Sequence, residues 1–184
     1  MVKPINIYKK VCILGDTKVG KTSIVNRYVA NKFTEDYTPS IGTKVSKKAV
    51  EIKDPTNQTQ GMLVTLMIWD LLGSREHANL HKAFYAGSEG GIIVCDIVRV
   101  DTREHLAFWV ENLRAVVPKG TPILIALNKV DGVPKEEKDK VVKEMRELCK
   151  KLEVAHVEVS AQTGDNVENM FYILSETMLV TRPF

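Results

Sequence analysis

Short runs of almost unbroken apolar residues recur along this chain, and stretches with helical spacing separate them. The run at residues 123–127 (ILIAL), for example, contains no polar residue. A strand that is apolar on both sides needs cover on both faces of its sheet, and such sheets are mostly parallel, with helices as the crossover connections. The length of 184 residues suits one such unit. We therefore predict a single α/β domain over residues 1–184, with a mainly parallel sheet and helices on both faces.

The spacing of the apolar residues also predicts the order of the elements. Strands are predicted at residues 11–14, 44–52, 62–69, 91–97, 123–127 and 156–159, and helices at residues 22–33, 78–86, 102–117, 136–152 and 167–179. Residues 54–61 (DPTNQTQG) are a turn sequence, so the strands on either side of it are expected to pair antiparallel. The sequence shows no internal repeat, linker or low-complexity segment.

Composition and charge exclude several classes of protein. Hydrophobic residues make up 44% and charged residues 27%, which excludes a disordered tail and a collagen-like repeat. The 26 basic and 23 acidic residues leave a net charge of +3, too small an excess to predict a nucleic-acid partner. The three cysteines have no CxxC spacing and the histidines are scattered, so we expect neither a zinc site nor a disulfide framework.

No segment of the sequence has the pattern of a membrane span or a lipid anchor. No apolar run reaches the roughly 20 residues that a transmembrane helix needs. Val2 stands where N-myristoylation requires glycine, and residues 181–184 include no cysteine for prenylation. We therefore expect a cytoplasmic monomer with no lipid anchor visible in this chain, recruited to a membrane, if at all, by a partner protein.

The first motif with chemical content is at residues 15–22 (GDTKVGKT), which match G-x-x-x-x-G-K-[ST] between a predicted strand and a predicted helix. In that context the backbone N–H groups of the turn and the helix N-terminus bind phosphate oxygens. Lys21 is expected to reach the β- and γ-phosphates of a nucleotide, and Thr22 to ligate Mg²⁺. The alternative is a chance glycine-rich turn. The predicted phosphate-binding residues are Asp16, Thr17, Lys18, Val19, Gly20, Lys21, Thr22 and Ser23.

A second polar motif, residues 128–131 (NKVD), follows directly after the apolar run at 123–127. Ligands of α/β sheets bind at the carboxyl ends of the strands, which is where this motif lies. A carboxylate there can accept two hydrogen bonds from guanine N–H groups, a pair that adenine does not offer, so Asp131 is expected to select guanine. Residues 160–162 (SAQ) close the next predicted strand, where a backbone N–H can donate to the guanine carbonyl oxygen.

These three motifs, in this order and with this spacing, resemble those of the Ras-superfamily small GTPases, and the Rab branch looks nearest. The resemblance covers about residues 9–179. It implies a P-loop GTPase fold, in which a six-stranded sheet has one antiparallel edge strand and five helices. It also implies a molecular switch that binds GTP and hydrolyses it to GDP with Mg²⁺. The implied partners are effector, exchange-factor and activating proteins that contact the switch loops, in the regulation of trafficking or signalling.

The resemblance also assigns roles to single residues. Phe33 would lie against the guanine, and Tyr37 and Ser40 would belong to the first switch. Asp70 would hold a Mg²⁺-bound water, and the N–H of Gly73, in the second switch, would sense the γ-phosphate. The implied Mg²⁺ site consists of Thr22, Ser40 and Asp70. The implied base contacts come from Asn128, Lys129, Asp131, Ser160, Ala161 and Gln162.

The second switch departs from the family pattern at its central position. The family usually has a glutamine there, which orients the attacking water, and this chain has Ser74, whose side chain is too short for the same contacts. Leu71 and Leu72 replace a usually small pair, and Lys18 adds a charge to the phosphate loop. These changes predict slow intrinsic hydrolysis with nucleotide binding retained.

Other groups are candidates to replace the missing glutamine. Arg75 or His77 could reach the site, because catalytic contacts can form only in the reacting complex. A partner protein could also supply an arginine, which contributes about 10³–10⁵-fold in known GTPases. The candidate catalytic residues are therefore Lys21, Ser74, Arg75 and His77.

Two other functions stay open at this point. A GTP-dependent scaffold with negligible intrinsic hydrolysis would follow from Ser74 alone. A P-loop kinase would share the phosphate loop but would not need the motif at residues 128–131. A basic stretch of Lys44, Lys47 and Lys48 is expected to be a solvated edge strand, with an acidic partner or a membrane surface as the alternative.

Overall fold

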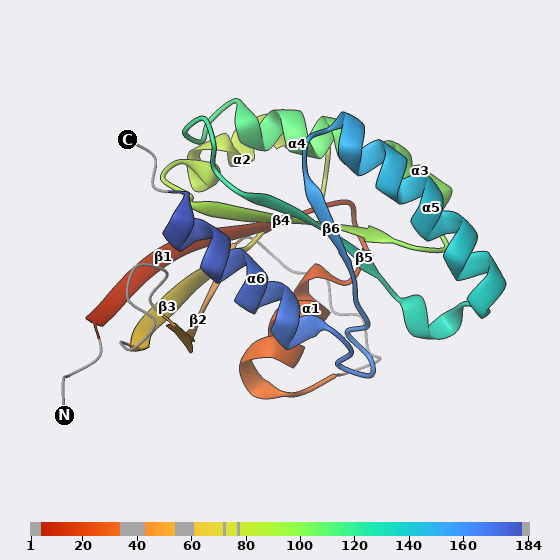
Figure 1. Ribbon diagram of the computed structural model, residues 1–184. Helices are drawn as coiled ribbons and strands as arrows, with labels where there is room; N and C mark the ends of the chain where they lie inside the picture. The colour runs from red at the N-terminus through yellow and green to blue at the C-terminus, as the bar shows by residue number, and fades with distance from the viewer. Residues whose placement is uncertain (1–4, 34–42, 54–60, 72, 77, 182–184) are drawn as a thin grey trace.

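One central sheet organises the computed structural model of the chain, which describes residues 5–33, 43–53, 61–71, 73–76 and 78–181 (Figure 1). The strands are β1 (Ile5–Leu14), β2 (Lys44–Lys53), β3 (Gly61–Asp70), β4 (Gly90–Asp96), β5 (Ile123–Asn128) and β6 (Ala155–Glu158). The helices are α1 (Lys21–Ala30), α2 (Ala78–Tyr85), α3 (Val100–Glu104), α4 (Leu106–Arg114), α5 (Lys135–Lys151) and α6 (Val167–Val180), with a 3₁₀ turn at Val130–Gly132.

The sheet has six strands in the order β2-β3-β1-β4-β5-β6. Strand β2 pairs antiparallel with β3, and the other neighbouring strands pair parallel. This topology confirms the predicted fold class, a mainly parallel sheet with one antiparallel edge strand. Parallel strands end at the same edge of the sheet, so the loops after β1, β4 and β5 meet there.

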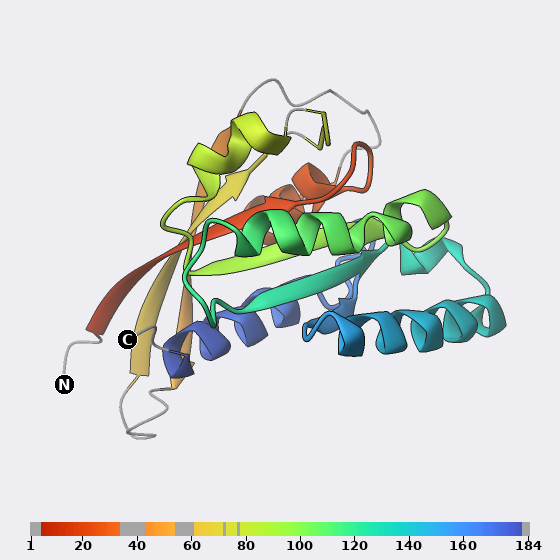
Figure 2. The ribbon, with the colours of Figure 1, turned by 90° about the horizontal axis from the view of Figure 1, so that it is seen from above.

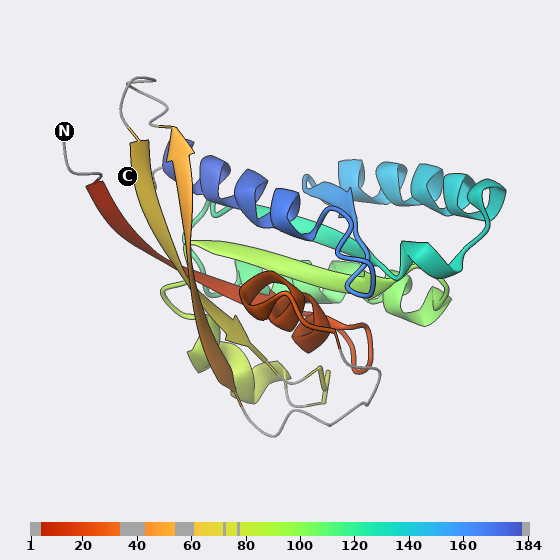
Figure 3. The ribbon, with the colours of Figure 1, turned by 90° about the horizontal axis from the view of Figure 1, so that it is seen from below.

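Helices cover the sheet on both faces (Figures 2 and 3). Neighbouring residues of one strand belong to different cores, because side chains alternate across a strand. Ile13 packs in the core that α1 and α6 cover, whereas Leu14 packs in the core that α2, α4 and α5 cover. Both residues are at most 1% exposed, which explains why this strand reads as continuously apolar near its end.

Strand β1 begins at Ile5, earlier than the predicted start at residue 11. Among the described residues, its first half pairs with β3 alone, from Ile5 opposite Met62 onward, whereas β4 joins at Val11. One face of this half is open, and Tyr8 there is 65% exposed. A half-covered strand alternates polar and apolar residues, so a search for unbroken apolar runs misses it.

The helix predicted over residues 102–117 is two helices, so that prediction is wrong in this respect. Helix α3 ends at Glu104, α4 starts at Leu106, and His105 lies between them. The hydroxyl of Thr102 donates to the carbonyl of Arg99 at 2.9 Å, and it accepts from the N–H of Asp96 at 3.0 Å. These bonds fix α3 to the end of β4, a constraint that the apolar stripe of α4 does not encode.

The edge strand β2 carries the basic stretch. Lys44 and Lys47 are exposed, as expected for a solvated edge. Lys48 differs, because its ammonium donates to the carbonyl of Tyr28 at 2.5 Å and lies 4.0 Å from the centroid of that ring. It also pairs with Glu168 of α6. Lys48 therefore links the edge strand to α1 and α6.

The two tryptophans have different surroundings. Trp109 of α4 is 1% exposed and belongs to the core. Trp69 of β3 is half-buried, and the ammonium of Lys10 lies 4.3 Å from its ring centroid. Its ring also lies 6.4 Å, centroid to centroid, from that of Phe84 on α2.

Candidate functional site

The loop between β1 and α1 has the backbone shape of an anion-binding turn. Gly15, Lys18 and Gly20 have φ values of 132°, 65° and 98°, in the range that disfavours most side chains. A Cβ at Gly15 would lie 2.2 Å from the carbonyl oxygen of Val94, and one at Gly20 would lie 2.3 Å from the amide nitrogen of Asn128. The loop therefore needs its two glycines, and helix α1 begins directly after it.

The side chain of Lys21 folds back into this loop. It is 7% exposed, and its ammonium donates to the carbonyls of Gly15 at 2.9 Å and Asp16 at 2.8 Å. Burial lowers the pKa of Lys21 to about 8, although the carboxylates of Asp70 and Asp16 act in the opposite direction. A buried ammonium inside a ring of backbone groups is suited to bind an anion such as phosphate.

Thr22 and Asp70 meet below the loop. The Thr22 hydroxyl donates to Oδ2 of Asp70 at 2.5 Å. Among the described residues, Oδ1 of Asp70 is buried and has no hydrogen-bond partner. Burial raises the pKa of the Asp70 carboxyl, against the hydrogen bond from Thr22 and the charge of Lys21. A hydroxyl beside a carboxylate with a free buried oxygen fits Mg²⁺ and its bound water.

The segment after β3 lies against the phosphate loop. The Thr17 hydroxyl donates to the carbonyl of Gly73 at 3.0 Å. A Cβ at Gly73 would lie 2.4 Å from the Lys21 ammonium and 2.5 Å from the carbonyl carbon of Asp16, so only glycine fits there. Ser74 follows and is half-buried. The residues predicted for the phosphate side and for the second switch are therefore in contact.

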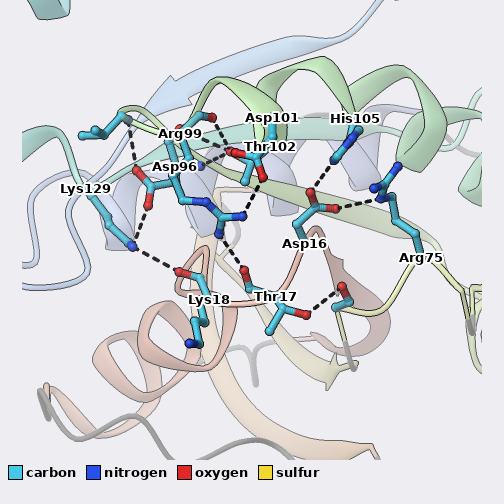
Figure 4. A network of polar contacts seen from close by, with 12 residues as sticks. Asp16, Thr17, Lys18, Arg75, Asp96, Arg99, Asp101, Thr102, His105 and Lys129 are labelled. Atoms are coloured by element: carbon cyan, nitrogen blue, oxygen red, sulfur yellow. Dashed lines mark hydrogen bonds and ion pairs between the residues drawn. The ribbon is translucent and has the colours of Figure 1, made fainter.

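The carboxylate of Asp16 points away from the loop, toward α4 and the second switch (Figure 4). It lies 2.5 Å from Nδ1 of His105 and accepts a bond from the indole N–H of Trp109 at 2.8 Å. Nε of Arg75 lies 4.0 Å from the same carboxylate, and the Arg75 side chain is 49% exposed. Of the catalytic candidates, Arg75 therefore lies beside the phosphate loop, whereas His77 is outside the described residues.

Two cations hold the outer turn of the phosphate loop by its carbonyls (Figure 4). Arg99 donates to the Thr17 carbonyl at 2.9 Å, and Lys129 donates to the Lys18 carbonyl at 3.1 Å. The Lys129 ammonium also lies 2.6 Å from Asp96, which is buried at the end of β4. The loops after β1, β4 and β5 are thus connected through side chains.

Asn128 connects the phosphate loop to the loop after β6. It is 1% exposed, its amide donates to the Val19 carbonyl at 2.8 Å, and its oxygen accepts from the Ala161 N–H at 3.1 Å. The Ser160 hydroxyl donates to Oδ1 of Asp131 at 2.5 Å. The three motifs of the sequence, distant along the chain, therefore form one hydrogen-bonded edge.

The remaining predicted residues have these positions. Ser23 is partly buried on α1, and Phe33 is partly buried against the core under α1 and α6. The Gln162 carbonyl accepts from Arg27, and its side chain is exposed. Tyr37 and Ser40, like Leu72 beside the second switch, lie outside the described residues, so the assignment of Ser40 as a Mg²⁺ ligand stays a prediction.

Several side chains that shape this edge were missed in the sequence. None of the three motifs includes these residues, and each of them contacts a segment that is distant in the sequence but close in the fold. They are Arg27, Asp96, Arg99, His105 and Trp109. The signal available in advance was weak: the motif at residues 128–131 predicts a neighbouring strand end, and Asp96 ends the preceding apolar run.

Two other kinds of feature are absent from the described residues. Within the part of the chain that the structure describes, no three side chains of His, Cys, Asp or Glu come together to form a metal cluster. None of the described helices is both long and apolar enough to cross a membrane.

The sequence of the chain is similar to those of known proteins over most of its length. The sequence model of the Ras family matches residues 10–180. Ras-related protein Rab-22A of Homo sapiens is 34% identical over 166 residues, which cover 90% of this chain and 81% of that protein. Ras-related protein RABA3 of Arabidopsis thaliana is 32% identical over 182 residues, which cover 96% of this chain and 71% of that protein. Ras-related protein RabC of Dictyostelium discoideum is 28% identical over 175 residues, covering 95% and 86%.

Proposed function

The chain belongs to the Ras family as a Rab-like small GTPase, and from that starting point we propose that GTP and GDP bind along the edge formed by its three motifs. The observation that carries the proposal is Asn128, which bonds the phosphate loop on one side and the Ala161 N–H on the other. A nucleotide lying along this edge would have its phosphates at Lys21 and its base at Asp131 and Ala161.

Each of these residues has a defined task in the proposal. The loop N–H groups and the Lys21 ammonium bind the β- and γ-phosphates, because Lys21 already lies within the loop. Thr22, Ser40 and Asp70 hold Mg²⁺, which when bound would neutralise charge on the phosphates. Asp131 accepts two guanine N–H bonds, and Ser160 fixes the direction of its carboxylate. Further contacts are proposed for the phosphate loop, for α1 and the segment after it, and for the loops after β5 and β6. They come from Asp16, Thr17, Lys18, Val19, Gly20, Ser23, Phe33, Tyr37, Lys129 and Gln162.

Hydrolysis is the second part of the proposal, and it is slow without a partner. Ser74 replaces the residue that orients the water, and its side chain lacks the amide. Arg75 lies near the phosphate loop, but its Nε faces the Asp16 carboxylate at 4.0 Å. The side chain therefore has to reorient before it can contact a γ-phosphate or the attacking water. The N–H of Gly73 would sense the γ-phosphate, and release of this contact after hydrolysis would change the second switch.

The cellular role follows from the family in outline. The switch loops would bind effector, exchange-factor and activating proteins in the regulation of trafficking or signalling. The protein would act as a monomer in the cytoplasm, with recruitment to a membrane through a partner. Residues 1–184 would form a single G domain.

A test of the base contact uses Asp131→Ala, with Asp165→Ala as the matched control, since Asp165 is an exposed aspartate in the loop after β6. Inosine diphosphate lacks the 2-amino group of GDP, so the wild type should prefer GDP by about tenfold or more, the value of one charge-assisted bond. Competition against a fluorescent GDP should show the preference lost in Asp131→Ala and kept in Asp165→Ala. An unchanged preference in Asp131→Ala would rule out the proposed base site.

A GTP-dependent scaffold with negligible hydrolysis is the second candidate, and Ser74 is the residue that favours it. Single-turnover hydrolysis of bound GTP with Mg²⁺ should be slow in the wild type and faster in Ser74→Gln, because a positioned catalytic group contributes about 10²–10⁴-fold. Glu76→Gln adds the same amide two residues further along and should have no effect. Rapid hydrolysis by the wild type would eliminate the scaffold and make Arg75→Ala the next variant to measure.

A further inference from the structure

Arg27 of α1 makes its hydrogen bonds with the loop that follows β6. Its Nε donates to the Ala161 carbonyl at 3.0 Å, and its Nη2 donates to the Gln162 carbonyl. The guanidinium is planar with a fixed fork of donors, so it matches two successive carbonyls in a way that a lysine ammonium does not. The loop is thereby attached to the helix that begins at the phosphate loop.

The same guanidinium also reaches the end of its own helix. Its Nη1 donates to Oδ1 of Asn31 at 3.2 Å. Asn31 is the left-handed residue that ends α1, with φ of 50°, and Phe33 follows two positions later. Arg27 therefore connects two segments that the proposed function gives to the base: the Ala161 loop and the exit of α1 toward Phe33.

The Ala161 loop is also attached to the segment after β5, because the Ala161 N–H donates to Asn128 at 3.1 Å and the Ser160 hydroxyl donates to Asp131 at 2.5 Å. Inside the loop, the Thr163 N–H donates to the Ser160 hydroxyl at 3.0 Å and the Gly164 N–H donates to the Ser160 carbonyl at 2.8 Å. These bonds shape the loop but do not attach it to α1. A Cβ at Gly164 would lie 3.4 Å from Cδ of Arg27, so the loop backbone passes close over the arginine stem.

We infer that Arg27 is a positioning residue for the guanine base: by holding the Ala161 loop and the α1 exit together, it sets how long a guanine nucleotide stays bound. The inference rests on the proposed function, because it assumes that Ala161 and Phe33 contact the base. Arg27 itself would make no contact with the nucleotide, because its donors are bonded to backbone carbonyls and to Asn31. It acts through the carbonyls of Ala161 and Gln162, which hold the backbone of the Ala161 loop in place against α1.

The experiment measures release of a fluorescent GDP from the Mg²⁺-loaded protein. Arg27→Ala should release it about tenfold faster or more, since a hydrogen bond to a charged group is lost at two carbonyls. Arg27→Lys keeps the positive charge but can bond only one of the two carbonyls well. Its GDP release rate should therefore lie between those of the wild type and Arg27→Ala. Arg114→Ala is the matched control, because Arg114 also donates to a backbone carbonyl, that of Glu153 at 3.2 Å, away from the base loop.

Hydrogen exchange under saturating GDP separates positioning from a general loss of structure. In Arg27→Ala, exchange should rise at residues 31–33 and 160–164 and stay unchanged at residues 15–22 and in α5. If Arg27→Ala does not fold, Arg27→Lys carries both measurements.

Two results would overturn the inference and leave the proposed function standing: GDP release within about twofold of wild type, or exchange raised evenly along the chain. A wild type that does not retain GDP would instead remove the proposed function itself, so the two failures are distinguishable.

Discussion

The base side and the phosphate side of the site differ in how their polar groups are satisfied. On the base side, Asn128 and Ser160 bond groups of other segments, so the framework is complete within the protein. On the phosphate side, burial lowers the pKa of Lys21 and raises that of Asp70, and the described residues leave Oδ1 of Asp70 without a partner. The base side is built to persist, whereas the phosphate side holds charges that a ligand would stabilise.

The largest expected effect is on nucleotide affinity, at Lys21 on the phosphate side, where affinity should fall far more than the stability of the protein. Lys21→Met should lower GDP affinity by about 10²–10⁴-fold, because two charge-assisted hydrogen bonds contribute about 1.5–3 kcal/mol each. The nucleotide-free protein should lose little thermal stability, because the loss of the bonds to the Gly15 and Asp16 carbonyls is offset by the removal of a charge that burial disfavours. Titration with fluorescent GDP and thermal unfolding measure the two quantities. Lys32→Met, at an exposed position, is the control, and a loss of affinity below about tenfold would contradict the assignment of Lys21.

Asn128→Ala should show the opposite combination, a loss of stability even without nucleotide. The substitution leaves the Val19 carbonyl and the Ala161 N–H without their partner, at about 1–3 kcal/mol each. Urea unfolding should therefore report a loss of about 2–6 kcal/mol. Asn128→Asp keeps the acceptor for Ala161 but places a buried carboxylate oxygen against the Val19 carbonyl, so it should lose at least as much stability as the alanine variant. Equal stability of wild type and Asn128→Ala would show that the base side is not a fixed framework.

Gly73→Ala tests how closely the second switch packs on the phosphate loop. The new Cβ would lie 2.5 Å from the carbonyl carbon of Asp16, so the backbone has to move apart. We expect a cost of about 1–3 kcal/mol, typical of overpacking, together with faster hydrogen exchange at residues 73–76. Gly132→Ala is the control, since nothing lies within 4 Å of a Cβ there. Unchanged exchange at residues 73–76 would mean that the contact with Asp16 is dispensable.

Thr17→Val gives the smallest effect, because it removes one exposed hydrogen bond and keeps the side-chain shape. The lost bond to the Gly73 carbonyl is expected to be worth about 0.5–1.5 kcal/mol. Chemical denaturation should show this loss in Thr17→Val and not in Thr17→Ser, which keeps the hydroxyl. A serine variant as unstable as the valine variant would point to packing instead of the hydrogen bond.

The sequence predicted the sheet and the motif residues because each of these signals is local. The run at residues 123–127 is buried on both faces at every position, and its pattern shows this directly. The phosphate loop is recognisable because its glycines, lysine and threonine are adjacent in the chain. Asn128 was assigned to the base from its motif, but its bond to Val19 depends on the neighbouring strand end and is not encoded nearby.

The sequence could not predict residues whose role depends on distant segments. His105 interrupts a continuous apolar stripe, and only its contact with Asp16 gives the interruption a function. Arg27 has no motif, because its acceptors are backbone carbonyls, which every residue has. The first half of β1 was missed for a different reason: it is covered on one face, so its pattern alternates.

Strand β1 has a consequence for how this chain can change in evolution. Ile13 and Leu14 belong to different cores, and the phosphate loop starts at the next residue. Inserting or deleting one residue in β1 would exchange the side chains of the two cores and turn the loop to the other face. Changes in length should therefore be tolerated in surface connections and selected against between Val11 and Lys21.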